Sequence, residues 1–183
     1  MIYLLIILQA TLVNGVQNDL IYMTESGHAE FTSRVPLHSF TGVSDHLTGM
    51  IDPAENLVDF YLDLNTLRTG IDRRDRDMFR TLNVNEYPFA EFTGSFASSF
   101  NMNTEEQQRV IVSGKFTING VSRDAEIEGI IQKSGSDIHI QAEWTINLND
   151  YNIDPPGILF YRVNEEQEIR IAAVLIPREN NSN

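Results

Sequence analysis

Apolar residues recur at every second position along most of this chain, from Leu20 to Ile176. Alternation with a period of two is typical of β-strands that are buried on one face. In the segment 138–148, six apolar side chains fall on one side and polar side chains fall on the other. The pattern predicts nine strand segments, at 20–24, 29–35, 43–51, 57–64, 89–100, 109–118, 121–131, 138–148 and 168–176.

The dipeptide Asn119-Gly120 predicts a tight hairpin between two of these segments. Both residue types tolerate the positive φ that a two-residue type I′ turn requires. A loop of this length fixes the register, so Ile118 faces Val121 and Gly114 faces Ala125. One face of the hairpin is then mainly apolar with small side chains in its middle, and the other is polar and partly charge-complementary.

A single long segment has the spacing of a helix. Its start is predicted at Thr69-Gly70-Ile71-Asp72, where Thr69 caps the helix and Asp72 is the acidic partner. It ends before Tyr87-Pro88, because a residue that precedes proline avoids the helical conformation. One face is apolar (Ile71, Met78, Phe79 and Leu82), and we expect the opposite one to be a solvated ion-pair network (Asp72, Arg73, Arg74, Asp75, Arg76, Asp77 and Arg80). Strands and helix together predict a mainly all-β antiparallel barrel or sandwich with one short lid helix.

The first stretch, Met1 to Val13, is almost wholly apolar and is followed by polar residues. It is shorter than the roughly 20 residues of a membrane span but suits the hydrophobic region of a secretory signal. We predict a signal peptide at residues 1–15, with a retained anchor and a first core strand as alternatives. The rest of the chain is expected to form one domain, 16–178, and a frayed polar tail, 179–183.

Composition narrows the classes of function. The 183 residues carry 13 Lys and Arg against 26 Asp and Glu, which gives a formal net charge of -13. Nucleic-acid binding needs clustered basic residues, so we expect no nucleic-acid partner. The chain contains no cysteine, which excludes disulfides, thiolate metal sites and a cysteine nucleophile.

The sequence offers little catalytic chemistry. The four histidines are scattered without metal-ligand spacing. Ser44-Asp45-His46 places the residue types of a catalytic triad side by side, but no Gly-x-Ser-x-Gly elbow accompanies them. We therefore predict that the protein is not an enzyme and holds no metal and no cofactor.

Two blocks of sequence resemble the YceI-like family of exported lipid-binding proteins. They are TLRTGIDRRDRDMFRTLNVNEYPFAEFTG at 66–94 and SGKFTINGVSRDAEIEG at 113–129, and the resemblance extends from about residue 27 to 176. It implies an eight-stranded antiparallel β-barrel similar to lipocalins, whose apolar interior holds a long isoprenoid chain. The family often has a histidine in the helix where this chain reads Arg76-Asp77-Met78, so no role is carried over from it.

Inward-facing residues of such a barrel are the candidates for a ligand cavity. Each of them is equally compatible with a filled core, because an eight-stranded barrel is narrow. The small pair Gly114 and Ala125 favours a cavity, and Arg123 either reaches the barrel rim or holds a polar headgroup. The candidate ligand-binding residues are Phe31, Phe60, Leu62, Phe79, Phe92, Gly114, Phe116, Arg123, Ala125, Ile127, Trp144 and Ile146.

The hypothesis that follows is an exported binder or carrier, periplasmic or secreted, of a hydrophobic lipid such as an isoprenoid or a quinone-like molecule. The alternative is a barrel with a filled interior that acts through its surface as an interaction or stress-related module. A homodimer is possible for either form.

Overall fold

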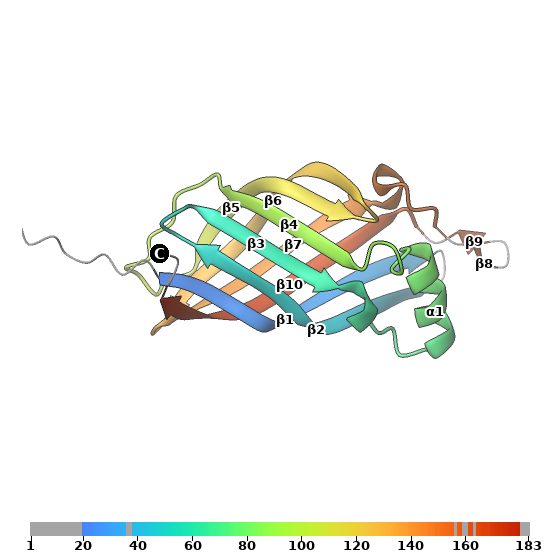
Figure 1. The fold of residues 1–183 in the computed structure, drawn as a ribbon, viewed down its shortest axis with the longest axis horizontal. Helices are drawn as coiled ribbons and strands as arrows, with labels where there is room; N and C mark the ends of the chain where they lie inside the picture. Colours follow the sequence, from blue (N-terminus) through green and yellow to red (C-terminus); the bar gives the residue numbers. More distant parts are fainter. Residues whose placement is uncertain (1–19, 36–37, 156, 159–160, 163, 180–183) are drawn as a thin grey trace, which may run out of the picture.

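The computed structural model describes residues 20–35, 38–155, 157–158, 161–162 and 164–179, and its main feature is a closed β-barrel (Figure 1). The wall strands are antiparallel and follow the order β1-β10-β7-β6-β5-β4-β3-β2. They are β1 (Leu20–Val35), β2 (His38–Asp52), β3 (Leu57–Asp63), β4 (Phe89–Phe96), β5 (Gln108–Ile118), β6 (Val121–Ser134), β7 (Asp137–Asn147) and β10 (Glu166–Glu179). The predicted eight-stranded antiparallel barrel is therefore confirmed.

The remaining elements lie outside the wall. The described residues contain one α-helix, α1 (Asp72–Thr81), and two short 3-10 helices, η1 (Leu64–Thr66) and η2 (Leu148–Tyr151). A two-stranded ribbon consists of β8 (Gly157–Ile158) and β9 (Tyr161–Arg162). The predicted single short helix is thus present.

Two of the predicted strand segments, 20–24 and 29–35, form one continuous strand, β1. Its register against β10 shifts between Met23 and His28, which marks a β-bulge. Gly27 lies within this bulge, and a Cβ atom there would come within 3.0 Å of the Ala173 Cβ atom. The polar run at residues 24–28 looked like a break in the sequence because a bulge interrupts the alternation without ending the strand.

Other strand boundaries also differ from the prediction. The segment predicted at 89–100 ends at Phe96, while β2 and β10 are longer than predicted. β10 includes Glu179, so the first residue of the predicted frayed tail belongs to a strand, and residues 180–183 lie outside the described part. The predicted signal peptide at 1–15 also lies outside the described residues.

The hairpin between β5 and β6 has the register that the turn predicts. Asn119 and Gly120 have φ values of 52° and 70°, and the pairs include Ile118 with Val121 and Gly114 with Ala125. The outer face holds the Lys115–Asp124 ion pair at 2.8 Å. This prediction is confirmed because turn chemistry and burial specify the same register.

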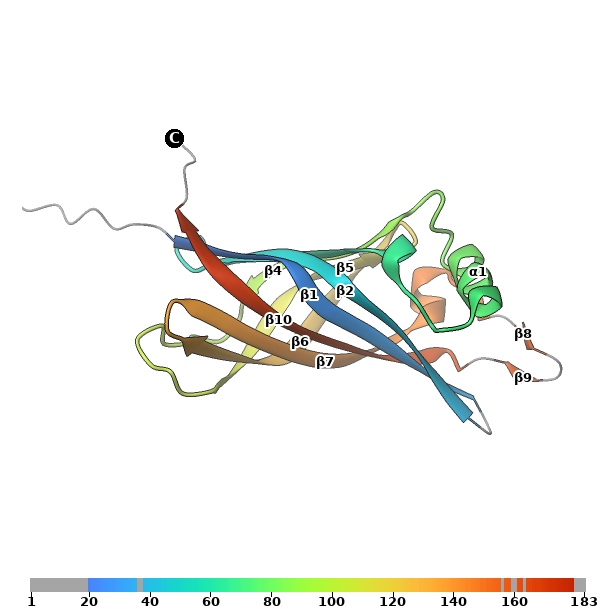
Figure 2. The ribbon, with the colours of Figure 1, turned by 90° about the horizontal axis from the view of Figure 1, so that it is seen from below.

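The two ends of the barrel differ in what covers them (Figure 2). We call the end that carries α1, η1 and η2 the helix end; there β1 ends and β2 begins. We call the opposite end, where β1 begins and β10 ends, the closed end. The Phe96 and Phe100 rings contact each other there in a tilted arrangement with centroids 4.4 Å apart, and Phe100 and Met102 pack against the core.

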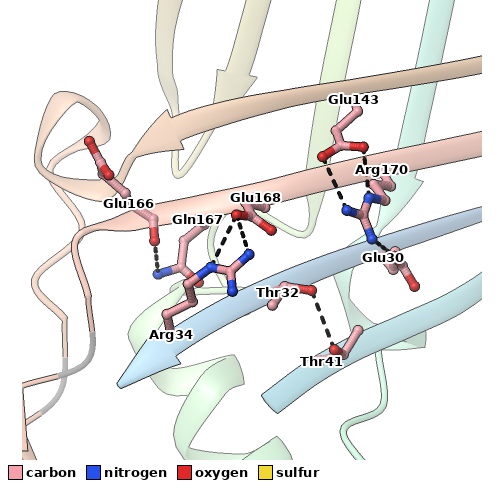
Figure 3. Close-up of polar contacts among 9 residues, drawn as sticks. All are labelled: Glu30, Thr32, Arg34, Thr41, Glu143, Glu166, Gln167, Glu168 and Arg170. Atoms are coloured by element: carbon pink, nitrogen blue, oxygen red, sulfur yellow. Dashed lines mark hydrogen bonds and ion pairs between the residues drawn. The ribbon is translucent and has the colours of Figure 1, made fainter. Parts of the chain in front are cut away.

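Ion pairs connect neighbouring strands on the outer face of the wall (Figure 3). Arg170 on β10 donates hydrogen bonds to Glu143 on β7 at 2.8 and 3.1 Å and lies 3.5 Å from Glu30 on β1. These hydrogen bonds hold the pKa of the Glu143 carboxyl below its usual value. Exposed ion pairs contribute little to stability, so the stability of the barrel depends mainly on the packing of its interior.

Among the described residues, none of the helices has the length and apolar character needed to cross a membrane.

Candidate functional site: a cavity inside the barrel

The barrel encloses a cavity of about 970 Å³. Val110 and Ile118, eight residues apart on β5, both line it. At about 3.3 Å per residue, this separation corresponds to roughly 26 Å along the strand. The cavity is therefore long, and its shape suits a chain-like molecule better than a compact one.

Most of the lining is aliphatic or aromatic and comes from the inward positions of the wall strands. Phe60 and Leu62 on β3 line the cavity, and so do Ile169 and Ile171 on β10. The inward side chains alternate with outward polar ones, as the sequence pattern requires. The lining offers a ligand mainly apolar contact.

The cavity also reaches the molecular surface. At the helix end, its lining includes Ile71, which is 53% exposed, and the exposed arginines Arg73 and Arg80. On the wall, it includes the exposed residues Ile130 and Gln141, from β6 and β7. The exposed residues beside α1 mark an opening of the cavity at the helix end.

The junction of β6 and β7 is incomplete. The two strands pair between Gly129 and Ser134 on β6, but residues 121–128 pair with β5 alone. Inside this gap, the Phe116 ring makes edge contacts with Trp144 at 5.9 Å and with Tyr151 at 5.7 Å between ring centroids. Aromatic side chains therefore cover the part of the wall that lacks strand pairing.

Eight of the twelve candidate ligand-binding residues line the cavity. They come from six different wall strands, which the closure of the barrel brings together. The eight are Phe31, Phe60, Leu62, Phe92, Phe116, Ile127, Trp144 and Ile146.

Gly114 and Ala125 face each other as predicted but do not line the cavity. A Cβ atom at Gly114 would come within 2.3 Å of the Thr93 carbonyl oxygen and 2.6 Å of the Gly94 Cα atom. The glycine thus permits close contact between the backbones of β4 and β5 and does not open space for a ligand. The prediction that this small pair favours a cavity is therefore wrong.

Arg123 and Phe79 also lie away from the cavity lining. The exposed Arg123 side chain donates a hydrogen bond from Nε to the Asp150 carbonyl oxygen at 2.9 Å, across the β6/β7 gap. Of the two roles considered, reaching the rim is the one seen. Phe79 packs against the core, with the Arg68 guanidinium 5.7 Å from its ring centroid.

The charged face of α1 differs from the predicted solvated network. Asp75 is only 7% exposed and accepts hydrogen bonds from the Thr69 N–H and hydroxyl at 2.8 and 2.5 Å. The predicted cap at Thr69 with Asp72 as its partner is therefore wrong: the N-cap is Ile71, which makes no side-chain cap bond, and Asp75 accepts the hydrogen bonds from Thr69. Arg80 and Asp77 form a surface pair at 3.2 Å, as expected. A buried carboxylate thus ties α1 to the segment that precedes it.

The triad types at Ser44-Asp45-His46 do not assemble a catalytic site. Ser44 is buried, and its hydroxyl lies 2.6 Å from the Thr66 hydroxyl. Asp45 instead lies 2.6 Å from the Nδ1 atom of His28, and this hydrogen bond raises the pKa of the imidazole against the opposing effect of burial. Nor do three or more potential ligand residues gather into a metal site anywhere in the described ranges.

The polar residues of the lining were not among the cavity residues predicted from the sequence. Ser33 and Gln167, 0% and 5% exposed, face each other across β1 and β10 at the helix end. Arg74 also lines the cavity, with its guanidinium carbon 4.6 Å from the centroid of the Phe40 ring. The alternation of β1 gave a signal, because Ser33 continues the inward series of Ala29 and Phe31.

The family model of the YceI-like domain matches residues 22–175. No curated protein matches the chain significantly. A polyisoprenoid-binding domain from Saccharophagus degradans is similar in structure, with a TM-score of 0.70 and 20% identity over 87% of this chain and 98% of that domain.

Two further solved structures share the fold. Burkholderia cenocepacia BcnA has a TM-score of 0.68 and 16% identity over 81% of this chain and 95% of its own. The Campylobacter jejuni YceI protein has a TM-score of 0.57 and 15% identity over 97% of this chain and 92% of its own.

Proposed function

This chain belongs to the YceI-like family, and we propose that it binds and carries a hydrophobic, isoprenoid-like lipid held non-covalently inside the barrel. The cavity is the observation that carries the proposal. Side chains can fill an eight-stranded barrel, yet this one keeps a volume of about 970 Å³. The space favours a carrier over a filled barrel that acts through its surface alone.

Binding would be driven by removal of the lipid chain from water. Each buried methylene contributes about 0.8 kcal/mol, so ten of them contribute about 8 kcal/mol before the cost of association. The length of the cavity and its aliphatic lining support a linear chain. The structural relative described as a polyisoprenoid-binding domain supports an isoprenoid, and an isoprenoid quinone is included in this proposal.

The proposal includes export. Residues 1–15 have the anatomy of a secretory signal, so the mature protein would start near Val16 and act in the periplasm or outside the cell. The intact mass of the protein after expression of the full chain in a bacterial host tests this. A mature protein that keeps residues 1–15 would contradict it. A homodimer stays a prediction, which light scattering after size-exclusion chromatography checks.

Lipid extraction tests the central claim. The purified protein is extracted with organic solvent, and the extract is analysed by mass spectrometry. We expect one class of long-chain lipid in stoichiometric amount. If the extract holds no stoichiometric lipid, and the protein stripped of lipid takes up no prenyl compound, the carrier function is wrong.

A cavity-filling substitution provides a second test. Ala142 lines the cavity, whereas Ala172 faces outward on the neighbouring strand. We expect Ala142→Leu to reduce lipid uptake about tenfold, because the added side chain occupies space that the ligand needs. Ala172→Leu is the matched control and leaves uptake unchanged. Equal uptake by the two variants would contradict binding in the barrel.

A further inference from the structure

The described residues contain three buried side-chain polar atoms without a hydrogen-bond partner. They are the Ser33 hydroxyl, the Nε atom of Arg74 and the Nε1 atom of Trp144. Buried polar groups in proteins are nearly always paired, so each such atom requires an explanation. All three residues line the same cavity. A shared ligand explains the three exceptions together.

Two of these residues, Ser33 and Arg74, both neighbour Phe40 at the helix end of the cavity. Ser33 pairs with Phe40 across β1 and β2, and the Arg74 guanidinium lies over the Phe40 ring at 4.6 Å. Trp144 is on β7, which is separated from β1 by β10 alone. Its backbone pairs with Ile169, the next inward position after the Gln167 that faces Ser33. The polar atoms therefore gather in the half of the cavity nearest α1.

All three groups can donate hydrogen bonds. The indole and guanidinium nitrogens only donate hydrogen bonds, and a serine hydroxyl can donate as well. The Gln167 amide donates its hydrogens to the backbone carbonyl oxygens of Asn164 and Glu166, so it does not compete with the three groups for an acceptor. A group that accepts several hydrogen bonds would satisfy this set.

The positive charge of Arg74 also favours a hydrogen-bond acceptor that is negatively charged. Within the described part of the chain, no carboxylate lies within ion-pair distance of Arg74, which donates a hydrogen bond from its terminal NH2 group to the Thr69 carbonyl oxygen at 2.8 Å. Asp75 is already bonded by Thr69, and Asp77 pairs with Arg80. A guanidinium is always charged in proteins, so Arg74 brings to the helix end of the cavity a cation without an ion-pair partner.

The structure assigns to the helix end of the cavity a subsite, formed by Ser33, Arg74 and Trp144, for the oxyanion head of a single-chain amphiphile. The apolar chain then extends toward the closed end. This inference rests on the proposed function and adds the class and orientation of the ligand. A phosphate ester and a carboxylate share the required chemistry, and the experiment separates them.

Titration calorimetry with ligands of one chain tests the subsite. The probes are geranylgeranyl monophosphate, geranylgeranoic acid, geranylgeraniol and inorganic phosphate alone. We expect at least one of the two anionic lipids to bind about tenfold or more tightly than the alcohol, because charge-assisted hydrogen bonds are the stronger ones. Inorganic phosphate alone is expected to bind far more weakly. The alcohol binding as tightly as both anionic lipids would overturn the subsite, while failure of every lipid to bind would contradict the carrier function itself.

A matched pair of variants on α1 separates contact from general electrostatics. Arg74→Gln and Arg76→Gln remove the same charge, but Arg76 is exposed and makes no hydrogen bond or ion pair in the described structure. We expect Arg74→Gln to weaken the preferred anionic lipid about tenfold and the alcohol less than twofold. Arg76→Gln is expected to change both less than twofold. If both variants lost the same affinity for the anionic lipid, the effect would come from the overall electrostatic field of the protein, and the subsite would be overturned.

Ser33 and Trp144 supply independent readouts. Ser33→Ala should leave the melting temperature of the free protein unchanged or higher, because it removes an unpaired buried hydroxyl, yet should weaken the anionic lipid about threefold or more. Trp144 is the single tryptophan of the chain, so its indole N–H gives one assignable NMR signal. We expect this signal to move downfield with the preferred anionic lipid and not with the alcohol. The same shift with both would overturn the assignment of Trp144 to the headgroup.

Discussion

At the closed end of the barrel, Ile138 and Leu175 face each other across β7 and β10 with no exposed surface. At the helix end of the same sheet, Ser33 is equally buried but brings an unpaired hydroxyl to a cavity. Burial at the closed end fills space between apolar side chains and stabilises the fold. Burial at the helix end keeps water away from polar groups without pairing them. Equal burial therefore completes the packing at one end and leaves a polar group unpaired beside the cavity at the other.

The largest expected effect comes from two isoleucines on one strand. Ile138 is fully buried, whereas Ile140, two residues on, lines the cavity and is partly exposed. We expect Ile138→Ala to lower the free energy of unfolding by about 2–5 kcal/mol, as for other buried isoleucines. Ile140→Ala should cost less than half as much, because space beside this side chain is already empty. Urea unfolding of both variants without lipid measures the difference. Equal losses of unfolding free energy would mean that side chains lining the cavity are packed as tightly as those in the filled core.

A second comparison concerns how the lid helix is held at the helix end. Asp75 accepts two hydrogen bonds from Thr69, while Asp72 is exposed and makes no such contact. We expect Asp75→Ala to lower the free energy of unfolding by about 1.5–3 kcal/mol, because hydrogen bonds to a charged group are lost. Asp72→Ala should change it by less than about 0.5 kcal/mol. Faster proteolysis between η1 and α1 in the first variant alone would locate the effect. If the two variants unfold alike, Asp75 does not anchor the helix.

The smallest expected effect concerns the outer face of the wall, where no buried group is involved. The pKa of His28 is raised above 6.5 by its hydrogen bond to Asp45, so the pair stabilises the folded state fully below pH 6.5. This contribution is lost as the pH rises through the folded-state pKa. NMR titration of the imidazole checks the direction, and His28→Gln should flatten the dependence of the melting temperature on pH in that range. An imidazole that titrates below pH 6.5 would contradict the contact.

Much of the fold followed from short-range signals. The alternation of residues 138–148 and the Asn119-Gly120 turn predicted both the strands and the pairing of β5 with β6, since pleat and turn geometry are local properties. The bulge at Gly27 was missed, because a bulge depends on the two neighbouring strands. The role of Gly114 was misread for a related reason. A gap in side-chain volume looks the same in a sequence whether a ligand or another backbone fills it.

The inward and outward faces of the strands, and with them eight residues of the cavity wall, follow from the local alternation of the sequence. Only the tertiary structure decided that the interior stays open, because the diameter of a barrel depends on how all its strands close. It also decided which polar residues face that space. Ser33, Arg74 and Trp144 lie far apart in the sequence, and a missing hydrogen-bond partner is a property of the folded surroundings. The local sequence pattern therefore specifies which side chains line the wall, and the closure of the barrel specifies which polar groups come together in the cavity.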